Sequence, residues 1–319
     1  MKALGFGAGA RSCALRWRRA VGADIPALTV FLREGEERRV GFSGRLLRES
    51  GGAGSASLRL PSPLRGAVWV ADGERTPPEW ATARCAKPVP AIAGAVLCHP
   101  SRLVFPIFPD PASDRDAEIS LFTSSFSPAS VVGMAGDVAR YESALRLAPK
   151  ATVAYRMMAR AGGRAAPLDA ATPIRPGLTI RRACPGDLCA LLPLQEAYER
   201  EEVLTSMHEF NPAACKASLA RALERQLVFA AEEAGVIIGK AGTNARGFAV
   251  DQIGGVYTLP ARRGRGIANA LMAALLSEIS FQGRSPALFV KLTNGAARAL
   301  YRGLGFEDIG DYRADYFEA

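Results

Sequence analysis

The sequence predicts an α/β protein with two domains, and three observations lead to this prediction. The chain has 319 residues, more than a single hydrophobic core usually organises. Its hydrophobic content of 49% is enough for ordinary globular cores. Strand-like and helix-like segments alternate, and a stretch rich in glycine, alanine and proline interrupts them at residues 159–177. We therefore expect an N-terminal α/β domain at residues 1–158, a linker at 159–177 and a second domain at 178–319.

The patterns within residues 1–158 are short, and intervals rich in glycine, serine and proline separate them. They predict a first helix at 25–34 capped near Asp24, strands at 67–70 and 93–97, an amphipathic helix within 131–147 and a last strand at 151–158.

The second domain has stronger signals. Leu178–Ala183 alternates as a strand does, and Asp187 is a candidate cap for a helix that runs towards residue 202 with a kink at Pro193. Asn211 followed by Pro212 is a favourable start for another helix. The remaining expected elements are strands at 227–232, 236–245 and 250–259, a helix from 267, a strand at 287–292, a helix from 294, and a final pair of strands at 306–309 and 312–317.

The junction at residues 252–269 combines a strand, a short basic turn and a helix. The strand stops at Pro260, the turn contains Gly264 and Gly266, and the helix begins near Ile267. The first turn of a helix carries N–H groups without partners, and glycine lets them approach a phosphate closely. The junction therefore predicts an anion site. It does not match a dinucleotide fingerprint, and no Gly-Lys-Ser or Gly-Lys-Thr of a phosphate loop occurs in the chain.

Two motifs in the second domain resemble one known family. The segment Arg263-Gly-Arg-Gly-Ile-Ala268 resembles the [QR]-x-x-G-x-[GA] pyrophosphate loop of GCN5-related N-acetyltransferases. The segment from Asn294 to Phe306 resembles that family's N-x-x-A-x-x-L-Y-x-x-L-G-F signature at every fixed position. The resemblance covers residues 178–319 and implies a mixed, mostly antiparallel central sheet flanked by helices. Residues 1–158 faintly resemble a degenerate copy without the pyrophosphate loop, and an unrelated α/β domain is the alternative.

The resemblance implies an enzyme that uses acetyl-CoA as acyl donor and acetylates a primary amine by direct attack in a ternary complex. Tyr301 matches the general acid for the departing thiolate, although its helical spacing alone predicts a core tyrosine. Asn294 is also a favourable N-cap for purely local reasons. The residues implied to bind the cofactor are Val256, Tyr257 and Thr258 on the fourth strand, the loop residues Arg263, Gly264, Arg265, Gly266, Ile267 and Ala268, and Asn294.

The sequence leaves the general base open. Each candidate also has an ordinary interpretation as a surface or capping residue. The segment from residue 201 to residue 211, where this family usually shapes its acceptor site, is the best region. The candidates are Glu201, Glu202, His208, Glu209, Asp251 and Tyr257.

Composition argues against several other classes. The net charge of +9 is spread over both halves, so nucleic-acid binding is a minor interpretation. Two histidines and scattered cysteines predict reduced thiols and no metal site. The chain shows neither an apolar run of membrane-spanning length nor a signal-peptide core, which predicts a cytoplasmic protein without a membrane partner.

Several properties stay open at this stage. The acceptor is a small-molecule or peptide amine that the sequence does not identify, and a homodimer is one option for the oligomeric state. Two alternative functions also remain: a non-catalytic sensor that binds acyl-CoA, and a transferase of another acyl group.

Overall fold

The structure, a computed structural model, describes residues 16–49, 56–60, 67–73, 91–109, 118–160, 176–205 and 209–317. Its first half contains β1 (Trp17–Arg19), α1 (Ile25–Arg33), α2 (Val40–Leu46), β2 (Leu47–Glu49), β3 (Ala56–Leu58), β4 (Ala67–Gly73), β5 (Ala91–Cys98), β6 (Leu103–Ile107), α4 (Ile119–Thr123), β7 (Ser130–Met134), α5 (Ala135–Leu145) and β8 (Ala151–Ala159). Its second half contains β9 (Leu178–Arg182), α6 (Leu188–Tyr198), a π-helical turn (Glu199–Val203), α7 (Pro212–Arg225), β10 (Val228–Glu233), β11 (Val236–Arg246), β12 (Val250–Thr258), α8 (Ile267–Phe281), β13 (Ser285–Lys291), α9 (Gly295–Gly303) and β14 (Glu307–Tyr316).

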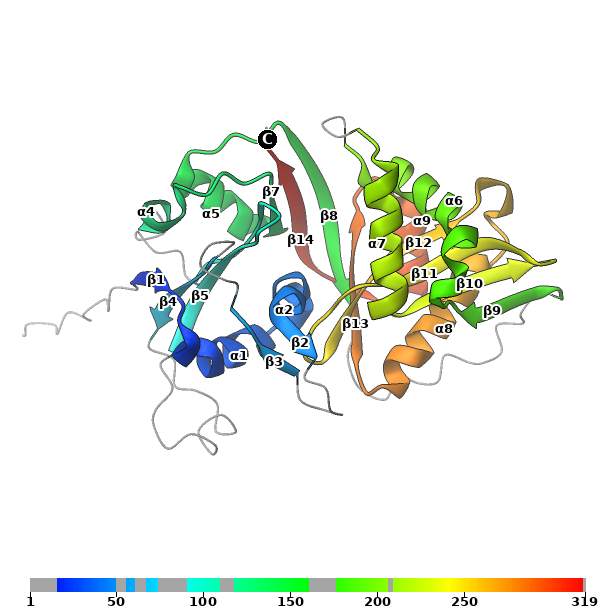
Figure 1. Ribbon diagram of the computed structural model, residues 1–319, viewed down its shortest axis with the longest axis horizontal. Helices are drawn as coiled ribbons and strands as arrows, with labels where there is room; N and C mark the ends of the chain where they lie inside the picture. Colours follow the sequence, from blue (N-terminus) through cyan, green and yellow to red (C-terminus); the bar gives the residue numbers. More distant parts are fainter. Residues whose placement is uncertain are drawn as a thin grey trace, which may run out of the picture.

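A twelve-stranded sheet runs through both halves of the described residues (Figure 1). Its order is β1-β4-β5-β6-β7-β14-β8-β13-β12-β11-β10-β9, and β2 and β3 form a separate pair. Helices cover both faces of the sheet. In the second half, α6 and α7 pack on one face around Leu191 and Leu219, and α8 packs on the other around Leu271 and Leu275.

The two halves repeat the same arrangement. In each, five strands follow one another across the sheet, antiparallel except for the last pair, which is parallel: β6 with β7 and β12 with β13. Two helices separate the first and second strands of each series, and one helix separates the fourth and fifth. The first half is therefore a second copy of the same fold, which confirms the degenerate-copy prediction over an unrelated α/β domain.

A polar network of the same design marks the start of both copies. Arg18 on β1 donates two hydrogen bonds of 2.7 Å to Asp24, and Arg181 on β9 donates bonds of 2.8 and 2.9 Å to Asp187. The two aspartates were predicted to cap the helices that follow them. Neither does so, because each carboxylate binds its arginine and the backbone N–H three residues earlier. The Nε atoms complete the networks, from Arg18 to Asp72 and from Arg181 to Glu232.

The two copies exchange their last strands. β8, which ends the first copy, pairs with β13 of the second, and β14, which ends the second copy, pairs with β7 of the first. β8 and β14 also pair with each other. The predicted final pair of strands is therefore wrong: residues 307–316 form one strand, and Gly310, with φ 146°, lies at a register shift within it rather than in a turn. The predicted boundary at residues 159–177 stays a prediction, since 161–175 lie outside the described residues.

Most other predicted elements are confirmed. Asn211 caps α7 by accepting a hydrogen bond of 2.9 Å from the Ala214 N–H. Pro193 lies inside α6, as expected. The amphipathic helix expected within residues 131–147 begins at Ala135, because the preceding residues form β7. None of the helices described is both long enough and apolar enough to span a bilayer.

Candidate active site

β12 separates from its neighbour at the middle of the sheet. Its parallel pairing with β13 runs from Val250 to Ile253 and stops there, although both strands continue. On its other side the register with β11 shifts between Gly254 and Tyr257, and Gly255 takes a positive φ of 65°. A positive φ favours glycine, so this bulge depends on the residue type. The backbone beyond the bulge is thus turned away from sheet pairing on the β13 side.

A buried lysine supports the bulge from behind. Lys240 on β11 is 4% exposed, and its Nζ donates a hydrogen bond of 2.9 Å to the Gly255 carbonyl. The same ammonium lies 4.7 Å from the centre of the Tyr198 ring. Burial lowers the pKa of Lys240 to about 8. A side chain at Gly255 would clash with this group, because a Cβ there would lie 2.9 Å from Nζ.

The glycine turn at the start of α8 has the backbone that an anion site needs. Gly264 and Gly266 have φ angles of 73° and 77°, and no heavy atom lies within 4 Å of a Cβ built at either position. Gly266 occupies the N-cap, so no side chain caps the first turn of this 15-residue helix. Its free N–H groups and the helix dipole therefore face open space. Arg263 is held beside the turn by hydrogen bonds to the Thr258 carbonyl, at 3.1 Å, and to Glu201, at 2.7 Å.

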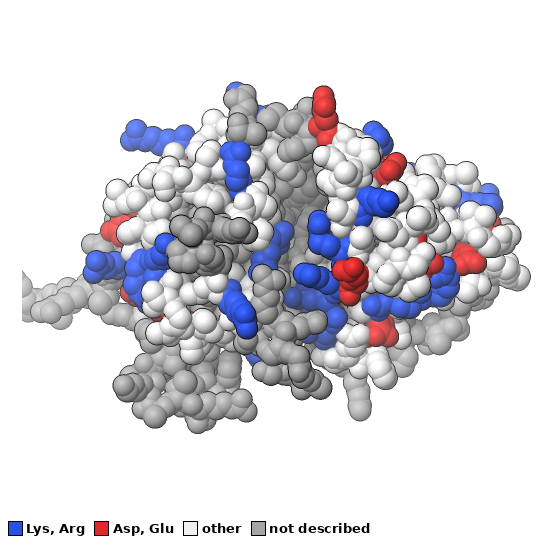
Figure 2. All heavy atoms as spheres, in the orientation of Figure 1, with Lys and Arg blue, Asp and Glu red and all other residues white. Residues whose placement is uncertain are grey.

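A cavity of about 1040 Å³ joins this turn to the separated strands and extends into the first half of the chain. Figure 2 shows the hollow between the two halves, with lysine and arginine side chains gathered along it. The lining contains every residue predicted to bind the cofactor except Arg265, together with Tyr301. From the first half it includes Arg45, Phe105 and Tyr155, and from β14 it includes Tyr312, Ala314 and Tyr316.

The π-helical turn at the end of α6 points two neighbouring glutamates at different partners. Glu201 accepts hydrogen bonds from the Tyr257 hydroxyl, at 3.1 Å, and from Arg263, at 2.7 Å. The bond from Arg263 is the main reason that the pKa of Glu201 is lowered. Because π-helical turns place successive side chains differently from an α-helix, they are often found at functional sites.

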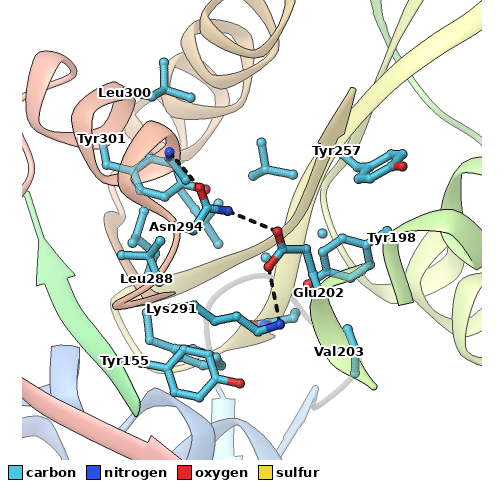
Figure 3. A pocket seen from close by; sticks show the side chains of 18 of the residues that line it. Tyr155, Tyr198, Glu202, Val203, Tyr257, Leu288, Lys291, Asn294, Leu300 and Tyr301 are labelled. Atoms are coloured by element: carbon cyan, nitrogen blue, oxygen red, sulfur yellow. Dashed lines mark hydrogen bonds and ion pairs between the residues drawn. The ribbon is translucent and has the colours of Figure 1, made fainter. Parts of the chain in front are cut away.

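Glu202 lines the same cavity as Glu201 but has different partners (Figure 3). One carboxylate oxygen accepts a hydrogen bond of 3.0 Å from the Asn294 side chain, and the other lies 3.6 Å from Lys291 Nζ. Asn294 also caps α9, since its oxygen accepts the Ala297 N–H at 3.0 Å. The predicted N-cap is thus confirmed, and its amide group additionally holds one of the candidate bases.

Tyr301 lies on α9 and is both a core residue and a cavity residue. It is 7% exposed, its ring centre is 6.0 Å from that of Phe306, and its side chain lines the cavity near Asn294 (Figure 3). Burial, together with Tyr198 and Glu202, raises the pKa of its phenol well above the usual value. The hydroxyl therefore stays protonated at neutral pH.

Of the other candidate bases, Tyr257 lines the cavity and donates its hydroxyl hydrogen to Glu201, whereas Asp251 and Glu209 do not line it. Asp251 is fully buried on β12, where its Oδ1 binds Arg246 at 3.1 Å and Arg284 at 2.7 Å, so it is a structural ion pair. Glu209 does not line the cavity, and His208 lies outside the described residues. Within the described ranges no cluster of histidine, cysteine and carboxylate side chains could hold a metal ion, and the four cysteines found there are free.

The first copy has a tyrosine at the place of Tyr301. Tyr141 is the seventh residue of α5, as Tyr301 is of α9. Tyr141 is completely buried and does not line the cavity. The end of β6 is closed in this copy, because the Phe108 N–H donates to the Asp137 carboxylate at 3.0 Å. In the first copy, therefore, a carboxylate binds the backbone just after β6, and the tyrosine of α5 does not reach the cavity described above.

Comparison with known proteins agrees with these observations. A family model described as an acetyltransferase (GNAT) domain matches residues 194–315. Residues 194–315 form a GNAT acetyltransferase domain. No curated protein sequence matches the chain.

Solved structures that resemble the chain extend over both halves. A protein from Drosophila has a TM-score of 0.62 at 14% identity and covers 94% of this chain and 98% of its own. A tandem GNAT protein from the clavulanic acid biosynthesis pathway has a TM-score of 0.53 at 14% identity, with coverage of 96% and 99%. A GNAT-family acetyltransferase from Colwellia psychrerythraea has a TM-score of 0.50 at 11% identity, with coverage of 95% and 100%. These likenesses show that the tandem fold occurs in other proteins.

Proposed function

We propose that the protein is an N-acetyltransferase that moves an acetyl group from acetyl-CoA to a primary amine within a ternary complex. One observation carries the proposal. The uncapped glycine turn of α8, the separated edge of β12 and the Tyr301 side chain all border one cavity. An anion site, an unpaired strand edge and a protonated phenol are the three features that binding and cleaving an acyl-CoA requires.

The residues present fit acetyl-CoA. The first turn of α8 offers N–H groups for its pyrophosphate, with the guanidinium groups of Arg263 and Arg265 nearby in sequence. The backbone of residues 256–257 does not pair with β13, which leaves that side of the strand able to bond the pantetheine chain. Thr258 adds a further polar group, since its Oγ1 is buried without a hydrogen-bond partner and the residue lines the cavity. Bound there, acetyl-CoA supplies the activated acetyl group.

The chain's own residues suit the two proton movements of acyl transfer to an amine. Glu202 lines the cavity and is the candidate base best placed to take a proton from the acceptor nitrogen, because Glu201 already binds Arg263 and Tyr257. Tyr301 is the group suited to donate a proton to the departing thiolate, and Asn294 and Lys291 hold Glu202 in position. Proton gain by the carboxylate and proton loss by the phenol balance across one turnover.

Calorimetric titration with acetyl-CoA and with CoA, followed by thiol release against a panel of primary amines, tests the proposal. Binding together with amine-dependent thiol release is the expected result. Binding of acetyl-CoA without thiol release on any amine would favour an acyl-CoA sensor over an enzyme. No binding of either nucleotide would overturn the cofactor site itself.

A further inference from the structure

The cavity continues beyond the acetyl-transfer centre along an aromatic wall. Lys291 on β13, Tyr155 on β8 and Tyr312 on β14 are successive partners across the sheet, and all three line the cavity. Partners in register share one face of a sheet, and two strand spacings amount to about 10 Å. Phe289, two residues before Lys291 on β13, also lines the cavity and stacks on Tyr312 with ring centres 5.0 Å apart. The wall therefore leads from the Lys291 and Glu202 pair towards the first half of the chain.

An arginine stands at the far end of this wall. Arg45 on α2 lines the cavity, with its guanidinium 4.4 Å from the centre of the Phe105 ring. Its Nη1 donates a hydrogen bond of 2.6 Å to the carbonyl of Gly41, one turn earlier. Gly41 lets α2 approach β6 this closely, because a Cβ there would lie 2.9 Å from the Phe105 ring. The arginine is thus held by packing and by its own helix.

Arg45 has no acidic partner among the described residues. The other basic side chains that line the cavity do have one: Arg262 pairs with Glu233, Arg263 with Glu201, and Lys291 with Glu202. A guanidinium has five N–H donors, and Arg45 uses only one of its own on the Gly41 carbonyl. Burial lowers the pKa of Arg45, which reflects the cost of holding this charge away from water. A partly buried charge without an ionic partner is unfavourable until an anion arrives.

We propose that Arg45 binds an oxyanion group, a carboxylate or a phosphate ester, on the acceptor amine. The body of the acceptor packs against Tyr155 and Tyr312, and its anionic group lies on the order of 10 Å from the reacting nitrogen, the span of two strand spacings. The inference rests on the proposed acetyl transfer for the role of the bound molecule. Because Arg45 lies on α2, the first copy of the fold would take part in selecting the acceptor.

Binding of small anions tests the site without any turnover. We would titrate benzoate, phenyl phosphate and neutral benzamide into the full chain saturated with CoA, by calorimetry. We expect at least one of the two anions to bind at least tenfold more tightly than benzamide, and the comparison of the two anions identifies the preferred oxyanion. Arg45→Gln should weaken anion binding by roughly tenfold to a hundredfold, as expected for hydrogen bonds to a charged group.

Two further variants serve as controls for the loss of charge and for misfolding. Arg38→Gln removes the same charge from an exposed position outside the cavity and should leave anion binding unchanged. Arg45→Lys keeps the charge but loses the planar fork, so it should retain part of the affinity even if the glutamine variant folds poorly. Equal anion affinity in wild type and in folded Arg45→Gln, equal binding of benzamide, or no anion binding by the wild type would overturn the proposal.

Measurements of turnover distinguish a failure of the anion site from a failure of the acetyltransferase proposal. With amines supplied as carboxylate and amide pairs, Arg45→Gln should raise KM for the carboxylates and leave the amides and the affinity for acetyl-CoA unchanged. A tenfold loss of acetyl-CoA affinity in this variant would assign Arg45 to the cofactor and overturn the inference. Arginine-dependent anion binding in a protein that releases no thiol would instead contradict the acetyltransferase proposal while the anion site stands.

Discussion

Replacing Lys240 with methionine should change how the free energy of unfolding depends on pH. Lys240 is 4% exposed, and burial lowers its pKa from 10.5 to about 8. Between these two values the unfolded chain holds a proton that the folded chain has released, so stability rises as the pH increases from 8 to 10.5. At pH 7 both states are protonated, and the folded state bears the full cost of burying the charge. Methionine has a similar length and no charge, so it removes this contribution.

The difference between the two pKa values sets the magnitude. At 1.36 kcal/mol for each pH unit, the wild type should gain about 3 kcal/mol relative to Lys240→Met between pH 7 and pH 10.5. Urea unfolding of both proteins across this range measures the gain. The buried tyrosines also titrate at the upper end, but they are present in both proteins and cancel. Parallel stability curves, within about 0.5 kcal/mol, would show that Lys240 is compensated by an acid and would refute the reasoning.

Three further substitutions test the proposed site. Gly266→Trp should abolish acetyl-CoA binding, measured by calorimetry, because the indole would cover the first turn of α8. The control Gly283→Trp lies just beyond the other end of that helix, with φ 67° and open space around it, and should bind acetyl-CoA normally. Equal binding by the two variants would show that the turn is not part of the cofactor site. Tyr301→Phe should lower kcat by about 10²-fold or more without changing the acetyl-CoA affinity. An unaltered kcat would show that Tyr301 has only a packing role. Glu202→Gln should lower kcat/KM by about 10²-fold and remove the acidic limb of the pH–rate profile, with a smaller effect for Glu201→Gln; equal losses would contradict Glu202 as the base.

The glycine turn of α8 and the two asparagine caps could be predicted because their signals are local. A helix N-terminus with glycine at its cap, and asparagines that cap α7 and α9, depend on residues within one turn. Gly264 and Gly266 take the positive φ angles that glycine favours, which explains why the turn contains them. Short-range chemistry of this kind is readable from one sequence.

The exchange of β8 and β14 could not be predicted in the same way. β8 pairs with β13 of the second copy, and β14 pairs with β7 of the first. No local sequence pattern distinguishes a partner strand in the same copy from one in the other copy. Gly310 followed by Asp311 resembles a turn, yet in the sheet it is an irregularity within one strand. The base candidates stayed open for a similar reason. Glu201 and Glu202 are adjacent in sequence, and only the π-helical turn separates their partners.

One non-local feature was available in the sequence. The segment R-R-A-x-x-x-D-x-x-A-L occurs at residues 18–28 and again at 181–191. In the structure its arginine and aspartate form the same network in both copies, from Arg18 to Asp24 and from Arg181 to Asp187. Comparing the chain with itself therefore predicts the duplication, because a partly buried hydrogen-bond network of this geometry depends on the same residue types at the same spacing.

The two copies have diverged in what their clefts contain. α5 and α9 carry tyrosine at the same place, but Tyr141 is sealed in the core while Tyr301 lines the cavity. The carboxylate of Asp137 binds the backbone just after β6, and a carboxylate at that point would repel a phosphate-rich ligand. The strand exchange places Tyr155 of the first copy beside Lys291 of the second. In the proposed function the second copy keeps the acyl-CoA cleft and the first copy extends its wall, so that a single cavity uses residues from both.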